Sequence, residues 1–139
     1  MILRKTWRWL VLGALLISLA ACTSGSVSGS GISCSKQRSG GSCSGSFNSL
    51  SGTYSQDIEP SRPRDRFVNA DVDVSVDSGS VRVYVTDADG YEKSVTVTPD
   101  QPASLSGQAR ITTRKFRVYF EAVEGTASGV NYTINYTAP

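Results

Sequence analysis

The chemistry open to this sequence is limited first by what it lacks. None of its 139 residues is a histidine, which excludes Ser-His-Asp and Cys-His catalysis and most zinc sites. The carboxylates Asp71, Asp73 and Asp77 remain, and their spacing places them on one face of a strand. Two of them could act as the acid and base of a glycoside hydrolase. The simpler interpretation, which we favour, is a solvated strand face.

A second group of oxygen ligands surrounds a predicted tight turn. Asp87 and Asp89, with Glu92 close behind, could hold calcium. The EF-hand pattern is not met, because Val85 and Thr96 stand where its first and twelfth positions require acids. We therefore predict a plain Asp-Gly turn, and neither a metal nor another cofactor.

Basic residues fall in two clusters, and tyrosines alternate with arginines elsewhere. The clusters are Arg62, Arg64 and Arg66, and Arg110, Arg114, Lys115 and Arg117. They could bind an acidic polysaccharide or lipid headgroups, or they could only keep the protein soluble and protect its strand edges. Tyr84 and Tyr119 could stack against a sugar, although half-buried strand tyrosines would give the same pattern. With Arg82 and Arg117, they are the predicted ligand-binding residues.

The first 22 residues have the order of an export signal. Arg4, Lys5 and Arg8 precede an apolar run over residues 9–21. This run suits a signal peptide, whose apolar region has about 7–15 residues, and is shorter than the about 20 residues that span a membrane. Leu19-Ala20-Ala21-Cys22 then resembles the lipobox of bacterial lipoproteins. The resemblance implies that residues 1–21 are removed and that Cys22 is lipidated on the exported face of the cell membrane. In a host with two membranes, Thr23 favours the outer one.

Removal of this signal changes the charge and the set of cysteines. Three of the 14 Lys and Arg residues lie in it, so 11 remain against 12 Asp and Glu residues. The mature chain is slightly acidic, and no nucleic acid partner is expected. With Cys22 on lipid, Cys34 and Cys43 are left as a pair in an oxidising compartment. There a disulfide is expected in preference to free thiols or a metal site.

Residues 22–46 are predicted to be a flexible, lipidated linker. They are mostly serine and glycine, with too few apolar side chains to offset the entropy cost of ordering them. We expect this tether to hold the domain away from the membrane surface.

Over residues 47–139 the sequence alternates with a period of two. In the clearest run, residues 68–77, valine and alanine alternate with polar residues. Further strands are predicted around residues 53–58, 81–85, 91–98, 103–111, 116–122 and 130–136. Six or seven short strands without a helical period predict an all-β fold. We expect a single antiparallel β-sandwich of jelly-roll type, after a disordered N-terminal signal and linker.

Ser78-Gly79 leaves the pairing of two of these strands open. A two-residue turn there would form a hairpin with Val76 opposite Val81 and Val74 opposite Val83. If the chain instead crosses between sheets at Gly79, the alternation is kept and those pairs do not form.

The region from Phe67 to Tyr136 is similar in rhythm to the prepeptidase C-terminal (PPC) type of bacterial β-sandwich. The segments that carry the resemblance are Val72-Asp73-Val74-Ser75-Val76, Ser80-Val81-Arg82-Val83-Tyr84-Val85, Asp89-Gly90 and Gly129-Val130-Asn131-Tyr132-Thr133-Ile134. The resemblance implies a β-sandwich of the kind that accompanies secreted enzymes, and it transfers no functional residues.

These observations together predict a membrane-anchored envelope lipoprotein whose domain is not an enzyme. The leading hypothesis is a binding or adhesion module for a glycan or an envelope protein. The second is a structural accessory subunit of a surface or secretion complex, and the third is a small hydrolase.

Overall fold

The computed structural model describes residues 25–139, which form eight β strands. The strands are β1 (Ser26–Ser28), β2 (Gly31–Gln37), β3 (Gly40–Ile58), β4 (Phe67–Ser75), β5 (Val81–Thr86), β6 (Glu92–Val97), β7 (Ala103–Arg110) and β8 (Phe116–Thr137). Every strand pair is antiparallel, which confirms the predicted all-β fold. The described part of the chain holds no helix that could cross a membrane.

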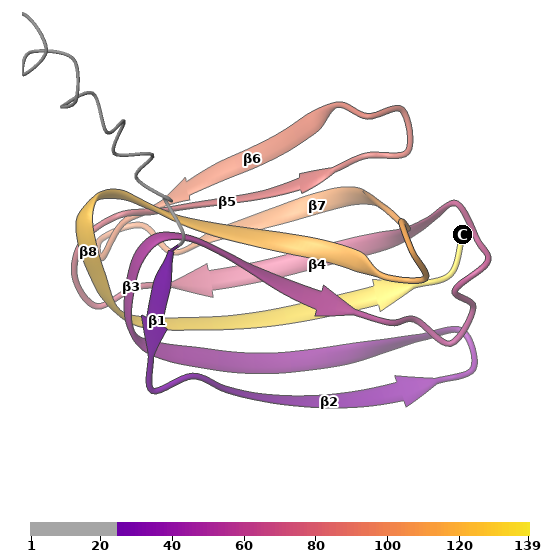
Figure 1. Ribbon diagram of the computed structural model, residues 1–139, viewed down its shortest axis with the longest axis horizontal. Coiled ribbons are helices and arrows are strands. Elements are labelled where there is room, and N and C mark those ends of the chain that lie inside the picture. Colours follow the sequence, from indigo (N-terminus) through magenta and orange to yellow (C-terminus); the bar gives the residue numbers. More distant parts are fainter. Residues whose placement is uncertain (1–24) are drawn as a thin grey trace, which may run out of the picture.

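Two long strands join all the strands into one sheet, which folds over into two layers (Figure 1). In the first layer, the first half of β3 pairs with the second half of β8, and the order is β2-β3-β8-β4-β7. The register shifts between Ser51 and Thr53. Beyond this shift the second layer has the order β3-β8-β5-β6. β3 and β8 therefore belong to both layers, and both curve round at one end of the sandwich (Figure 1).

The core lies between the layers and follows from the alternation. Inward positions of β4, β5 and β8 hold buried apolar residues, and the outward positions between them are mostly polar. Phe47 of β3 and Phe120 and Tyr132 of β8 form an aromatic centre, with ring centroids between 4.7 and 5.5 Å apart. Since Phe120 and Tyr132 lie in different layers, β8 contributes to both walls of the core.

At Gly79 the chain crosses between the layers. β4 pairs with β7 and β8, whereas β5 pairs with β6 and β8. The hairpin interpretation is therefore wrong, and the crossing is what the structure shows. Both strands keep their alternation, because each layer buries one face. Gly79 has a φ of 81°, and a Cβ there would lie 2.9 Å from the Cα of Ala127, so glycine suits this position.

The prediction of a flexible linker is wrong from residue 26 onward, where the chain forms β1, β2 and the first half of β3. In β3, serines alternate with Gly41 and Gly45, which lie opposite Tyr136 and Tyr132 of β8. A Cβ on either glycine would overlap the hydroxyl of the tyrosine opposite. The tyrosine rings thus cover the glycines, and β3 gains apolar contacts that its own side chains do not supply.

Candidate functional site

The four predicted ligand-binding residues share the outer face of the second layer. Arg82 and Tyr84 point outward on β5, and Arg117 and Tyr119 point outward on β8, because the residues between them are buried in the core. β5 and β8 are neighbours, and Tyr84 is the register partner of Tyr119. We call Arg82, Tyr84, Arg117 and Tyr119 the tyrosine platform.

The two tyrosine rings of the platform stack across the strands. Their centroids are 4.7 Å apart, and their planes differ by 5°. The Arg82 guanidinium lies 4.5 Å from the centroid of the Tyr84 ring, in cation–π contact. Because Tyr119 occupies one face of the Tyr84 ring, the guanidinium covers the other. Tyr84 is therefore enclosed on both faces.

The second face of the Tyr119 ring points toward β3, where Ser55 is its register partner. A serine side chain is too short to cover a phenol ring, and Thr53 and Asp57 flank it on the same face of β3. An apolar surface could stack on Tyr119 here, beside hydroxyls and a carboxylate. Beyond alternate spacing, the sequence has no sign of Ser55 and Asp57 as site residues, because it does not show that β3 lies beside β8.

Carboxylates hold Arg82 in place over the Tyr84 ring. Arg82 forms an ion pair with Glu92 of β6, and its Nη1 lies 3.5 Å from a carboxylate oxygen of Glu121. Burial, followed by the nearby Glu121, raises the pKa of the Tyr84 hydroxyl above its ordinary value of 10.0. This hydroxyl is therefore a neutral hydrogen-bonding group at neutral pH.

Asp57 of β3, on the side of Tyr119 away from Tyr84, holds Arg117 in place. Its Nε donates a hydrogen bond of 2.8 Å to Asp57 Oδ1 on β3. A hydrogen bond with Tyr119, followed by the charge of Asp57, raises the pKa of the Arg117 guanidinium. The platform thus keeps a permanent positive charge next to its open aromatic face.

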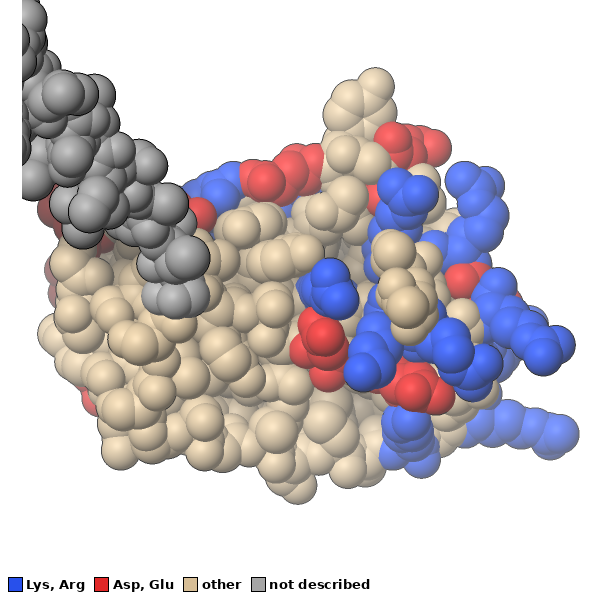
Figure 2. All heavy atoms as spheres, viewed as in Figure 1, with Lys and Arg blue, Asp and Glu red and all other residues tan. Residues whose placement is uncertain are grey.

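Both predicted basic clusters lie at one end of the sandwich. Figure 2 shows Lys and Arg gathered at this end, over the loops that join β3 to β4 and β7 to β8. The residues at this end are Lys36, Arg38, Arg62, Arg64, Arg66, Arg110, Arg114, Lys115 and Arg117. Three of them form ion pairs, namely Arg62 with Asp65, Arg114 with Glu59 and Arg117 with Asp57. The other six make no ion pair within residues 25–139.

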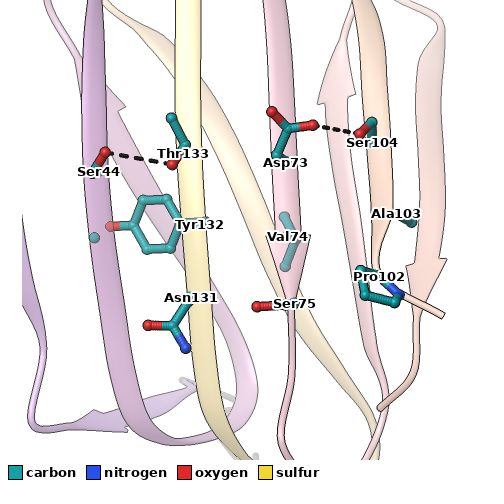
Figure 3. Close-up of a pocket in the computed structure, with 11 residues that line it drawn as sticks. Ser44, Asp73, Val74, Ser75, Pro102, Ala103, Ser104, Asn131, Tyr132 and Thr133 are labelled. Carbon is teal, nitrogen blue, oxygen red and sulfur yellow. Dashed lines mark hydrogen bonds between the residues drawn. The ribbon is translucent and has the colours of Figure 1, made fainter. Parts of the chain in front are cut away.

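The outward carboxylates of β4 belong to the first layer and lie away from the tyrosine platform. Figure 3 shows Asp73 in a cross-strand row of short polar side chains, Ser44, Thr133, Asp73 and Ser104. Asp73 accepts a hydrogen bond from the Ser104 hydroxyl, and the row lines a hollow of about 460 Å³. Asp71 lies outward on the same strand, but Asp77 lies past its end. The structure does not bring the three carboxylates together.

Asp87, the first calcium candidate, closes the turn between β5 and β6. Its Oδ1 accepts hydrogen bonds of 2.9 Å from the backbone N–H groups of Asp89 and Tyr91. Gly90 completes the turn with a φ of 91°. In the part of the chain that the structure describes, no three His, Cys, Asp or Glu residues are grouped so as to hold a metal ion. The Asp87 carboxylate is thus used by the backbone of its own turn.

The cysteines divide between described and undescribed parts of the chain. Cys34 on β2 and Cys43 on β3 are register partners joined by a disulfide, with Cα atoms 4.1 Å apart. The sequence predicts a disulfide for this pair, and the structure confirms that the two cysteines lie at disulfide distance. Cys22 and the signal, residues 1–21, lie outside the described residues, so lipidation stays a prediction.

Comparisons with known proteins identify no family for this chain. No protein-family model matches it, and no curated protein does. Among solved structures it is similar to oxalate oxidase in complex with the substrate analogue glycolate, with a TM-score of 0.44 and 13% identity over 79% of this chain and 51% of that one. It is also similar to procruciferin, an 11S globulin from Brassica napus, with a TM-score of 0.39 and 17% identity over 77% of this chain and 24% of that one. A variant of oxalate decarboxylase from Bacillus subtilis has a TM-score of 0.38 and 14% identity over 84% of this chain and 27% of that one.

This chain therefore spans about half the length of oxalate oxidase and a smaller share of the other two. All three TM-scores are low, so the description of the fold rests on this chain's own strands and register. The resemblance to PPC domains stays a prediction.

Proposed function

We propose that this chain is an exported lipoprotein, anchored through lipid on Cys22, whose β-sandwich binds a glycan at the tyrosine platform without acting on it chemically. The juxtaposition of Arg82, Tyr84, Arg117 and Tyr119 on one face carries the proposal. A sugar ring has an apolar C–H face and hydroxyls at its rim. The open face of Tyr119 suits the first, and the hydroxyls and charged groups around it suit the second.

The carboxylates on this face favour binding over hydrolysis. A glycoside hydrolase needs two carboxylates that flank one glycosidic bond. Here Asp57 bonds Arg117, and Glu92 and Glu121 hold Arg82. These groups stabilise the arrangement of the platform, and a rigid, pre-formed surface is what a binding module requires.

A structural accessory role is the second candidate, and strand β2 is the observation that favours it. Within the described residues β2 pairs only with β3. All of its residues are exposed, including Ile32 at 43%. An open sheet edge of this kind can accept a strand from another protein.

The test of glycan binding applies the full chain, purified from membranes in detergent, to a glycan array. Tyr119→Ala removes the open stacking face and is expected to lower the affinity about two- to tenfold, because an aromatic contact contributes about 0.5–1.5 kcal/mol. Tyr91→Ala is the matched control, since Tyr91 is 74% exposed but lies on the β5–β6 turn. This control is expected to bind as the wild type does.

Wild-type affinity of the Tyr119→Ala protein would exclude the platform as the binding site. Release of sugar from a bound glycan by the wild-type protein would show an enzyme instead. Capture of one partner protein in place of any glycan, lost in an Ile32→Lys variant, would favour the accessory role.

A further inference from the structure

A small cationic hollow adjoins the tyrosine platform. It has a volume of about 150 Å³ and is lined by Thr86, Arg110, Thr112, Lys115, Arg117 and Tyr119. The pairing between β5 and β8 ends at Tyr84 and Tyr119, so the hollow opens where these strands part. Arg117 and Tyr119 belong to both the platform and the hollow. A ligand stacked on the β3 side of Tyr119 would therefore reach the hollow around the edge of this ring.

The charged side chains that line this hollow are all positive. Three cations line it and no acidic residue does. Arg117 is paired with Asp57, whereas Arg110 and Lys115 make no ion pair within the described residues. The β5–β6 turn comes near Arg110, since a Cβ on Gly90 would lie 4.0 Å from its Nη1. The like charges repel one another, and a bound anion would relieve that repulsion.

The turn that brings Lys115 to the hollow is strained. Thr113 and Arg114 have φ values of 55° and 69°, in the left-handed region that favours glycine. They are the only described residues other than glycine with positive φ. Backbone hydrogen bonds of 2.7 and 3.2 Å between Thr112 and Lys115 hold the turn. Backbone strain that persists at one place in a fold points to a use for that place.

We propose that the hollow binds the sulfate, phosphate or carboxylate group of an acidic glycan whose sugar ring stacks on Tyr119. This rests on the proposed function and deepens it by naming the class of glycan. Guanidinium and ammonium groups form charge-assisted hydrogen bonds with these oxyanions, and an arginine can bind two oxygens at once. Hydroxyls of Thr86 and Thr112 add neutral donors.

The position of the hollow favours a glycan over the headgroups of the membrane that would carry the anchor. β1 pairs as far as Ser51 of β3, and Arg117 pairs with Asp57, about 20 Å further along the strand. β1 begins at Ser26, and the four residues from Cys22 to this point span at most about 14 Å. β1 and the basic end lie at opposite ends of the sandwich (Figures 1 and 2). An anchor at Cys22 would therefore keep the end with β1 near the membrane and turn the basic end outward.

The test compares two double variants of the full chain in detergent by titration calorimetry. Arg110→Gln with Lys115→Gln removes two charges from the hollow. Lys36→Gln with Arg38→Gln removes two charges from the β2–β3 turn at the same end. With dextran sulfate as probe, the first variant is expected to lose at least about tenfold in affinity and the second less than about twofold. Inorganic phosphate is expected to compete with dextran sulfate for the wild type.

Equal losses in the two double variants would overturn the site, because they would show attraction by the whole basic end. Binding of glycerophosphoglycerol, the free headgroup of phosphatidylglycerol, that is lost in the hollow variant, without binding to dextran sulfate, would overturn the glycan as ligand. Tyr119→Ala on uncharged dextran separates the two proposals. If only the stacking proposal is wrong, Tyr119→Ala binds uncharged dextran with wild-type affinity, while the two double variants still differ in their affinity for dextran sulfate. If only the anion-site proposal is wrong, the two double variants have equal affinity for dextran sulfate, while Tyr119→Ala still loses affinity for uncharged dextran.

Discussion

Tyrosine occupies three different environments in this protein, and the surroundings of each ring decide its role. Tyr132 lies in the core with 3% of its surface exposed, and its hydroxyl is 3.5 Å from Gln56 Oε1. Tyr84 and Tyr119 stand on the outer face and stack on each other. Tyr91 is 74% exposed on a turn. The same phenol group is thus a core residue, a platform or a solvated side chain.

The buried hydroxyl of Tyr132 makes the free energy of unfolding depend on pH. Burial, followed by the nearby Tyr54, raises the pKa of Tyr132 from 10.0 to about 12. The unfolded chain loses this proton near pH 10, whereas the folded protein keeps it up to about pH 12. The raised pKa therefore adds roughly 2–3 kcal/mol to the free energy of unfolding below pH 10. This contribution is lost as the pH rises from 10 to about 12.

Urea unfolding over this pH interval measures the effect in the wild type and in Tyr132→Phe. The variant keeps the aromatic ring but has no group to ionise. Its free energy of unfolding should fall less than that of the wild type. Parallel pH curves for the two proteins would show that the Tyr132 hydroxyl is not held in a low-dielectric site.

Among the elements, β3 and β8 carry the architecture because each runs through both layers. Gly125 and Gly129, with φ values of 62° and 63°, let β8 change direction between the layers. The first half of β3 contributes backbone pairing and space for rings, and β8 contributes the rings. The disulfide between Cys34 and Cys43 then fixes β2 to this pair.

Gly45→Val tests whether the Tyr132 ring of β8 needs the space that Gly45 of β3 leaves free. A side chain at this position would overlap the hydroxyl of Tyr132. We expect a loss of about 1–3 kcal/mol in the free energy of unfolding, as in other overpacked cores, measured by urea titration. Gly31→Val on β2 is the control, since nothing lies within 4 Å of a Cβ there. A loss equal to that of the control would mean that Tyr132 does not lie over Gly45.

The whole molecule is polarised in charge, and the proposed anchor would lie near one end of it. The β3–β4 and β7–β8 loops beside the hollow carry a net positive charge, whereas the turns and the corner at the opposite end carry Asp77, Asp100 and Glu124. β1 pairs at the corner of β3, on the acidic side. Along the long axis, the proposed anchor would come first, followed by the bend of β3 and β8, the core and the basic end. The tyrosine platform would lie on the outer face of the second layer.

Cys22→Ala tests the anchor on which this orientation depends. Without acyl chains the protein should leave the membrane fraction, or remain unprocessed, since firm membrane attachment needs about two buried chains. Cell fractionation with immunodetection measures this. Cys34→Ser with Cys43→Ser is the control, because it removes the disulfide and leaves Cys22 in place. A cleaved Cys22→Ala protein that stays in the membrane would contradict the lipid anchor.

The sequence by itself determined most strands after residue 66. Apolar and polar residues alternate in residues 68–76, 81–85 and 116–122, which fall largely within β4, β5 and β8. Alternation is a local property of a chain with one buried face. For the same reason the outward direction of Tyr84 and Tyr119 is predictable, since valine or phenylalanine stands on either side of each.

Only the tertiary structure decided which strands are neighbours. It placed the four platform residues on one face, took the chain across at Gly79 in place of a hairpin, and made a strand of the Ser/Gly-rich segment that begins at Gly40. Pairing depends on side chains from distant parts of the chain. Gly41 and Gly45 lie in a strand because Tyr136 and Tyr132 of β8 cover them, and no local pattern in residues 22–46 contains those rings.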